Sequence, residues 1–151
     1  MECSILPENF NKKEIMQTKK RTILIVEDDH DLLEIYTQAF KRENFDVAIA
    51  KDGKEAWQHI KNNFNAVDLI ISDIIMPKMD GFDLLEKIHF NDEYAKIPII
   101  ILTNLNQNGD RDAALALGAK KYFVKANITP KQLVGVVNEI LRITSSQRKI
   151  V

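Results

Sequence analysis

Short apolar segments alternate with segments of helical period along most of this 151-residue chain. Five of the apolar segments have the length of a strand: 23–26, 45–49, 67–71, 97–102 and 122–124. Apolar residues elsewhere recur at the spacing of one helix face, most regularly at Leu133, Val136, Val137, Ile140 and Leu141. A strand followed by a helix, repeated five times, predicts a parallel sheet with helices on both faces.

The five expected strands differ in how continuous their apolar residues are. Segment 45–49 alternates in part, as an edge strand does, whereas 23–26, 69–71 and 99–102 suit strands that are buried on both faces. These three therefore belong in the middle of the sheet. The pattern predicts a doubly wound α/β fold with five parallel strands, flavodoxin-like (βα)5, in the order 2-1-3-4-5. In such a sheet the ligand crevice lies at the carboxyl ends of strands one and three.

The chain length fits one domain of ordinary size. We expect this domain to span 22–143, with an extension at 1–21, a short polar tail at 144–151 and no output domain. The extension is polar, contains Pro7 and ends in two lysines and an arginine. A mobile tail and a helical turn around 12–17 both fit it.

Composition excludes several classes of protein. The net charge of -1 gives no overall attraction to nucleic acid or to an anionic membrane. No apolar run approaches the roughly 18 residues of a membrane helix, and the first residues lack the pattern of a secretory signal. The single cysteine, Cys3, fits a reducing compartment. We therefore expect a cytoplasmic protein.

Acidic residues follow the first and third expected strands directly. Asp73 precedes a loop that contains Pro77 and Gly81, and an exposed carboxylate there fits either a nucleophile or a helix-capping or solvated residue. Glu27 and Asp28 follow the first strand, and carboxylates crowded beside Asp73 would repel one another unless a cation joined them. Together these acids favour a site for a hard divalent ion such as Mg²⁺.

Three other polar residues follow the expected strands, and each fits a structural role or a role in binding a phosphoryl group. Asp29 is placed to cap the helix that follows the first strand. Thr103 and Lys125 follow the fourth and fifth strands, where a hydroxyl and an ammonium group would neutralise a phosphoryl group bound at the same edge. A threonine that ends a strand and a solvated lysine are the ordinary alternatives.

Residues 22–143 resemble the receiver (CheY-like) domain of two-component response regulators, in its stand-alone, single-domain form. Four blocks carry this resemblance, in the expected order and at the expected intervals: ILIVEDD, LIISDIIMPKMDGFDLL, IIILTN and GAKKYFVKA. The resemblance implies a signalling phosphoacceptor that catalyses only its own phosphorylation and dephosphorylation. It also implies a role for each residue that matches these blocks.

By that resemblance, Asp73 accepts a phosphoryl group from a phosphohistidine of a sensor histidine kinase or a histidine phosphotransfer protein. Mg²⁺, or another divalent cation such as Mn²⁺, is bound by Asp28 and Asp73, by Glu27 through water, and by the backbone carbonyl of Ile75. Lys125 binds the phosphoryl group, and Thr103 and Tyr122 are the switch residues. Phosphorylation draws the Thr103 hydroxyl inward, Tyr122 follows, and the face formed by the fourth helix, fifth strand and fifth helix changes for a downstream protein.

The sequence is compatible with more than one kind of partner. A terminal switch and an intermediate of a phosphorelay both fit the sequence. A homodimer is a further alternative, through a surface near Arg111, Ala114, Lys121 and Lys131.

This chain departs from the family pattern at three places. Ala126 stands where the family often has a proline in a cis peptide, which places the geometry of that loop in question. Asn104 stands where a small residue is usual. Ile75 is apolar where the family is often polar, and with Leu105 it would obstruct the water that hydrolyses an acyl phosphate.

Three other functions are alternatives to this one. A nucleotide- or flavin-binding enzyme would need a glycine-rich loop after the first strand, and Glu27-Asp28-Asp29 stands there instead. A phosphatase with an aspartyl nucleophile usually has a second acid two residues later, where this chain has Ile75. A binding module that keeps the receiver fold without phosphorylation is the most serious alternative.

Overall fold

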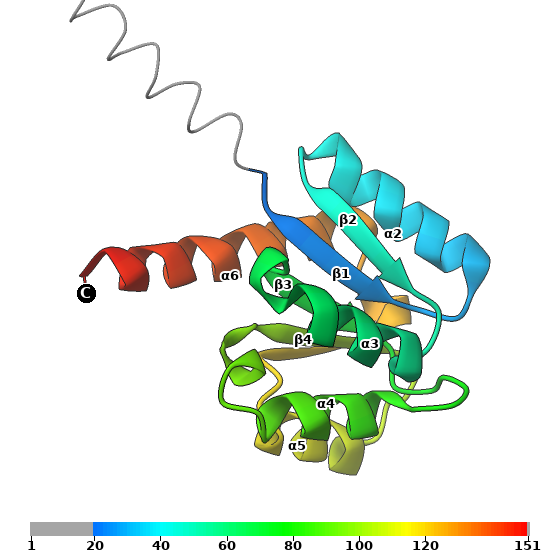
Figure 1. The fold of residues 1–151 in the computed structure, drawn as a ribbon. Helices are drawn as coiled ribbons and strands as arrows, with labels where there is room; N and C mark the ends of the chain where they lie inside the picture. The colour runs from blue at the N-terminus through cyan, green and yellow to red at the C-terminus, as the bar shows by residue number, and fades with distance from the viewer. Residues whose placement is uncertain (1–19, 151) are drawn as a thin grey trace, which may run out of the picture.

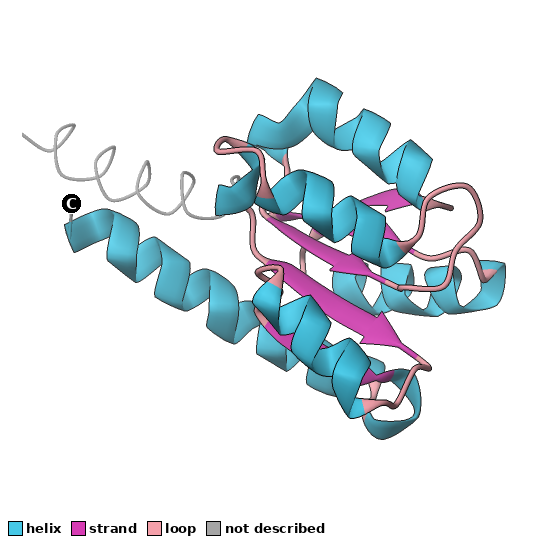
Figure 2. Ribbon diagram, turned by 90° about the horizontal axis from the view of Figure 1, so that it is seen from below, coloured by secondary structure: helices cyan, strands magenta, loops and turns pink. Residues whose placement is uncertain are grey.

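The computed structural model describes residues 20–150 as a central sheet between two layers of helices (Figures 1 and 2). The five strands are all parallel and lie in the order β2-β1-β3-β4-β5. Their bounds are β1 Thr22–Val26, β2 Asp46–Ala50, β3 Leu69–Ser72, β4 Ile99–Thr103 and β5 Lys121–Val124. This order confirms the predicted flavodoxin-like topology.

Within residues 20–150, five α-helices and three short 3-10 helices connect the strands or follow the last one. The α-helices are α2 His30–Arg42, α3 Gly53–Asn63, α4 Gly81–His89, α5 Asn108–Ala116 and α6 Pro130–Ile150. The 3-10 helices are η1 Phe64–Ala66, η2 Tyr94–Lys96 and η3 Lys125–Asn127. Helices α2 and α6 pack on one face of the sheet, and α3, α4 and α5 pack on the other.

The central strands bury both of their faces, as their continuous apolar sequences predict. In β1, Ile23 and Ile25 pack toward α2 and α6, while Leu24 and Val26 pack toward the opposite layer. Strand β2 lies at the edge of the sheet and keeps Ile49 exposed. The alternation in its sequence therefore identified its position correctly.

Aspartate caps begin three of the helices close to the carboxyl edge of the sheet. The side chains of Asp29, Asp52 and Asp80 accept hydrogen bonds from backbone amides three residues later, at 3.1, 2.8 and 2.8 Å. Each cap satisfies an amide that the first helical turn leaves without a partner. The cap predicted for Asp29 is confirmed. These caps fix where the loops around the site end.

The two ends of the chain bear on the expected domain limits. The backbone of α6 continues to Ile150, so residues 144–150, expected as part of a polar tail, extend the last helix. Residues 1–19 lie outside the described part, and with them the helical turn expected at 12–17. Among the described residues, no helix is long and apolar enough to cross a membrane.

Candidate functional site

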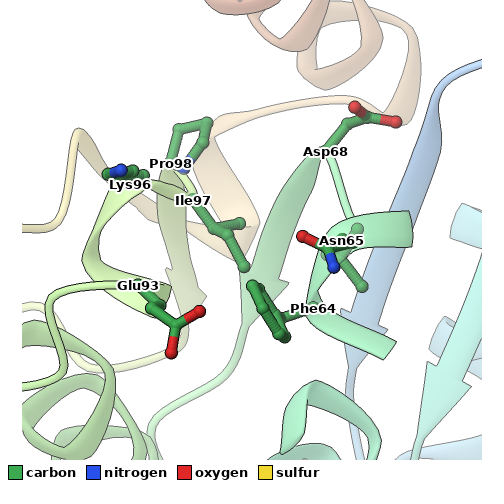
Figure 3. A pocket seen from close by; sticks show the side chains of 8 residues that line it. Phe64, Asn65, Asp68, Glu93, Lys96, Ile97 and Pro98 are labelled. Carbon is green, nitrogen blue, oxygen red and sulfur yellow. The ribbon is translucent and has the colours of Figure 1, made fainter. Parts of the chain in front are cut away.

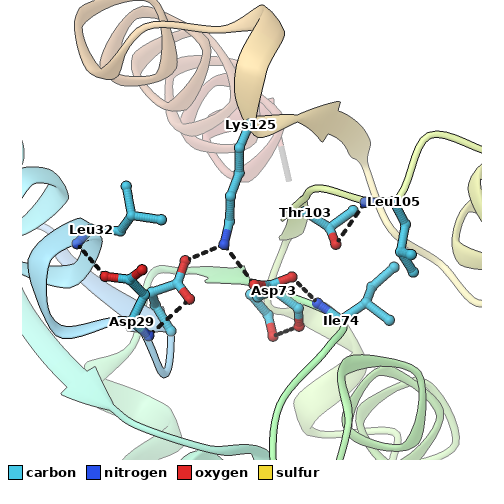
Figure 4. Close-up of polar contacts among 9 residues, drawn as sticks. Asp29, Leu32, Asp73, Ile74, Thr103, Leu105 and Lys125 are labelled. Carbon is cyan, nitrogen blue, oxygen red and sulfur yellow. Dashed lines mark hydrogen bonds and ion pairs between the residues drawn. The ribbon is translucent and has the colours of Figure 1, made fainter.

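The carboxyl edge of the sheet gathers the polar residues that the sequence singled out. Parallel pairing aligns Val26 with Ser72, and Thr103 with Val124. The residues that end or follow these strands therefore lie close together. Figure 4 shows Lys125 reaching toward Asp73, with Thr103 on the far side of Asp73. Topology thus brings together four segments that are distant in the sequence.

Lys125 connects two buried carboxylates. Its Nζ lies 2.5 Å from Glu27 Oε1 and 2.6 Å from Asp73 Oδ2. Burial alone would lower the pKa of the Lys125 ammonium, but its contacts with Asp73 and Glu27 outweigh burial and raise that pKa above its ordinary value. Lys125 is therefore a charged group that neutralises part of the acidic site.

Burial has the larger effect on Glu27. This residue is only 3% exposed, and burial raises the pKa of its carboxyl group, although contact with Lys125 acts in the opposite direction. Its second oxygen, Oε2, accepts a hydrogen bond from the Asp29 amide at 3.2 Å. Its two oxygens thus have different partners: the ammonium of Lys125 and a backbone amide.

Asp73 is held by the loop that follows it. Its Oδ1 accepts a hydrogen bond from the Ile74 amide at 2.6 Å, and the Ser72 hydroxyl donates to its backbone carbonyl at 2.8 Å. Gly81, at the start of α4, approaches this backbone closely: a Cβ there would lie 2.2 Å from the Asp73 carbonyl oxygen. Only glycine permits this approach, so Gly81 helps to fix the position of Asp73.

Three acids have the composition of a divalent-cation site. Glu27, Asp28 and Asp73 each offer a carboxylate oxygen, and these oxygens lie within 4.8 Å of one another. Two of the acids are buried, whereas Asp28 is exposed and open to solvent. Hard oxygen ligands of this kind suit Mg²⁺ or Mn²⁺. Asp29 serves instead as the cap of α2.

Thr103 and Tyr122 both contact the loop after β4 at Leu105. The Thr103 hydroxyl is fully buried and accepts a hydrogen bond from the Leu105 amide at 3.4 Å. The Tyr122 hydroxyl donates to the Leu105 carbonyl at 2.9 Å, and the residue is 5% exposed. The expected switch has this ring turning inward after phosphorylation. In this structure the ring is already buried, and the Leu105 carbonyl is its partner.

The three departures from the family pattern do not separate Lys125 from the acids of the site. There is no cis peptide in the described residues, so the Lys125–Ala126 bond is trans, and Lys125 still reaches both acids. Asn104 is exposed. Ile75 is 59% exposed and Leu105 is half-buried.

The surface considered for pairing of two copies needs one correction. Ala114 is fully buried in the core beneath α5, so it does not contribute to a surface. Arg111, Lys121 and Lys131 are exposed. Three cations remain at that surface, and like charges oppose the pairing of two identical faces unless acids of the second copy meet them.

Sequence reasoning overlooked two residues that support the site loop. Asp52 is buried, caps α3, and lies 3.7 Å from the Lys78 ammonium. Lys78 has a positive φ of 68°, which marks a tight turn in the loop after Asp73. The sequence Asp52-Gly53-Lys54-Glu55 has the form of a helix start and was the available signal.

Comparison with known proteins identifies the family. Residues 23–138 match the response regulator receiver domain. The chain belongs to this family. It is 36% identical to the response regulator GtcR of Aneurinibacillus migulanus over 122 residues, which are 81% of this chain and 48% of GtcR. It is 34% identical to the response regulator SaeR of Staphylococcus aureus, over 79% of this chain and 50% of SaeR.

Solved receiver domains have the same fold. A CheY-like receiver domain protein from Methanospirillum hungatei superimposes with a TM-score of 0.78 and 29% identity, over 85% of this chain and 99% of that one. This receiver domain spans about half the length of the two curated relatives named above, GtcR and SaeR. The family places the chain in two-component signalling as a phosphoacceptor domain.

Proposed function

We propose that Asp73 is the phosphoacceptor of this receiver domain. The observation that carries the proposal is the contact of Lys125 with both Asp73 and Glu27, at the edge of the sheet where Thr103 also lies. Asp73 is buried, and its carboxylate lies within 4.8 Å of the exposed Asp28 carboxylate. A single aspartate thus has a cation, a hydroxyl and two further acids around it.

The proposed reaction is a phosphoryl transfer from a phosphohistidine. The N–P bond of the donor breaks, its electron pair returns to the imidazole, and an Asp73 carboxylate oxygen forms the new O–P bond. Lys125 neutralises charge on the phosphoryl oxygens, and the Thr103 hydroxyl donates a hydrogen bond to one of them. Hydrolysis of the acyl phosphate returns Asp73 to its carboxylate, so the domain acts only on its own side chain.

Glu27, Asp28 and Asp73 fit a divalent cation, with the backbone carbonyl of Ile75 as a further ligand. When bound, Mg²⁺ or Mn²⁺ would supply neutralisation of the negative charge that a phosphoryl group brings to the site. The three acids would hold the cation, and its positive charge would offset the repulsion among their carboxylates. The buried pair gives the site its position, and Asp28 gives it access to solvent.

The proposed output is the α5-β5-α6 face. Leu105 connects the two switch residues, because its amide donates to Thr103 and its carbonyl accepts from Tyr122. A phosphoryl group that engages the Thr103 hydroxyl would stabilise the loop position in which Tyr122 is buried. The face would then present one conformation to a downstream protein. The donor would be a histidine kinase or a phosphotransfer protein in the cytoplasm.

Phosphorylation with a small-molecule donor tests this proposal. Three proteins are incubated with acetyl phosphate and Mg²⁺: wild type, Asp73→Asn and Asp31→Asn. Asp31→Asn is the control, because Asp31 lies exposed in the first turn of α2. Intact mass should show one added phosphoryl group in wild type and in the control, and none in Asp73→Asn or after chelation. An equal mass gain in Asp73→Asn would place the phosphoacceptor elsewhere. No gain in wild type, beside a reactive receiver control, would favour the phosphorylation-independent binding module.

A further inference from the structure

A second cleft lies at the amino edge of the sheet, opposite the acidic site. It has a volume of about 480 Å³ and opens between η1 and η2, where β3 and β4 begin (Figure 3). Its lining residues are Phe64, Asn65, Val67, Asp68, Glu93, Lys96, Ile97 and Pro98. None of the residues of the acidic site takes part in it, so the proposed function leaves this cleft unexplained.

The cleft combines an apolar wall with acidic sides. Phe64 points toward Ile97 across the middle of the view in Figure 3, while Asp68 and Glu93 lie on opposite sides of it. The lining includes two carboxylates, those of Asp68 and Glu93, and one ammonium group, that of Lys96. A matching ligand therefore has an apolar centre with positive charges on both flanks.

The chain enters the domain beside this cleft. The Thr22 amide, in the first residue of β1, donates a hydrogen bond to Asp68 Oδ2 at 2.8 Å. Asp68 is itself a lining residue, so the segment that precedes Thr22 leaves the domain next to the cleft. Because this segment is covalently attached next to the cleft, its effective concentration at the cleft is high.

The sequence of that segment matches the chemistry of the cleft. Residues 12–20 read KKEIMQTKK, in which the apolar pair Ile15 and Met16 has two lysines on each side. Met16 stands six residues before Thr22, which an extended chain covers in about 20 Å. This length is ample for the pair to return to a cleft that begins at Asp68.

We propose that the N-terminal extension binds in this cleft, with Ile15 and Met16 against Phe64 and Ile97. Lysines of residues 12–20 would lie near the carboxylates of Asp68 and Glu93. Because the cleft is at the amino edge, the bound extension leaves Asp73 and the α5-β5-α6 face free. The cleft is an interaction surface of the domain for its own extension.

Amide spectra of the full-length chain test the contact. In ¹H–¹⁵N spectra, Ile15→Ser/Met16→Ser should shift the amides of Phe64, Asn65, Glu93 and Ile97. Ile5→Ser/Leu6→Ser, which alters another apolar pair of the same extension, should leave them in place. Cleft amides that do not move in the first variant would overturn the proposal. So would shifts in wild type that depend on protein concentration, since they would assign the cleft to the extension of another copy.

A spin label provides an independent reading. Cys3 is the only cysteine of the chain, so a nitroxide attached there reports on the extension without added mutations. Broadening of the Phe64 and Ile97 amides should weaken in Glu93→Lys and stay unchanged in Glu139→Lys, a charge reversal on the exposed side of α6. The same broadening in all three proteins would show a free extension and refute the contact.

Discussion

Replacing Lys125 by methionine should destabilise the folded domain at neutral pH. Methionine keeps an unbranched stem but removes the ammonium group that lies 2.5 Å from Glu27 and 2.6 Å from Asp73. The two carboxylates, 3% and 7% exposed, would then lie together without that cation. Removal of one partner from a buried ion pair costs about 3–5 kcal/mol. Because Asp28 opens the site to solvent, we expect the lower end, about 3 kcal/mol.

The loss should depend on pH in a defined direction. Burial raises the pKa of Glu27 above its ordinary 4.5, and removal of Lys125 takes away an influence that lowers it. A carboxyl group whose pKa is raised by folding favours the folded state below its unfolded pKa and loses that contribution as pH rises through the folded pKa. The deficit of Lys125→Met should therefore be small below pH 4.5 and should grow toward pH 7.

Urea unfolding with chelator present measures this difference. Trp57 is the only tryptophan of the chain and stacks edge-on against Tyr94 at 5.5 Å, so its fluorescence reports on folding. With a slope of about 2 kcal/mol per molar urea, the midpoint should fall by about 1.5 M. Lys121→Met, an exposed lysine of β5, is the matched control and should unfold like wild type. Equal midpoints for wild type and Lys125→Met at pH 7 would refute the reasoning.

Three further changes test the loops around the site. Gly81→Ala should lower the free energy of unfolding by about 1–3 kcal/mol, because the added Cβ would meet the Asp73 carbonyl oxygen. Gly135→Ala in α6, where a Cβ meets no atom, is the control and should raise it by up to about 1 kcal/mol in the same urea titration. Tyr122→Phe removes the bond to the Leu105 carbonyl and should cost about 1 kcal/mol; an unchanged midpoint would mean that this bond contributes nothing net. Ile75→Asn should shorten the lifetime of the phosphorylated protein, measured by intact mass, because a polar side chain admits the water that hydrolyses the acyl phosphate. Ile35→Asn, at an exposed position of α2, is the control. A phosphoryl lifetime of seconds in wild type would contradict the expectation that Ile75 obstructs this water.

The fold was predictable because its main determinants are local in the sequence. Continuous apolar runs identified the central strands, and partial alternation identified β2 as an edge strand. The cap at Asp29 followed from residue type and position. The end of α6 was not predictable, because polar residues after 143 fit both an exposed helix and a tail.

The candidate site was predictable in its location and less so in its contacts. Parallel strands necessarily bring Glu27, Asp73 and Lys125 to one edge, whatever their side chains do. That Lys125 binds a phosphoryl group stays a prediction. Its contacts with Glu27 and Asp73 were not predicted, because they depend on how far a flexible side chain reaches. Burial of Ala114 was missed because it is the one buried residue of α5, so the helix gives no clear apolar stripe.

The charges at the site connect its stability with its affinity for a divalent cation. Three carboxylates, those of Glu27, Asp28 and Asp73, share the site with the ammonium group of Lys125, so two negative charges remain. One divalent cation cancels that charge. Lys125→Met leaves three negative charges. It also removes the ammonium group, which repels an incoming metal ion. At 4 Å and an effective dielectric constant of 20, that repulsion is about 4 kcal/mol per pair of unit charges. Relief of even a third of that repulsion would raise the affinity for the metal ion about tenfold. Calorimetric titration with Mn²⁺ should therefore show at least about tenfold tighter binding in Lys125→Met, although the variant is less stable. General loss of folding would weaken binding instead, so a weaker Mn²⁺ affinity in the folded variant would contradict this account of the site.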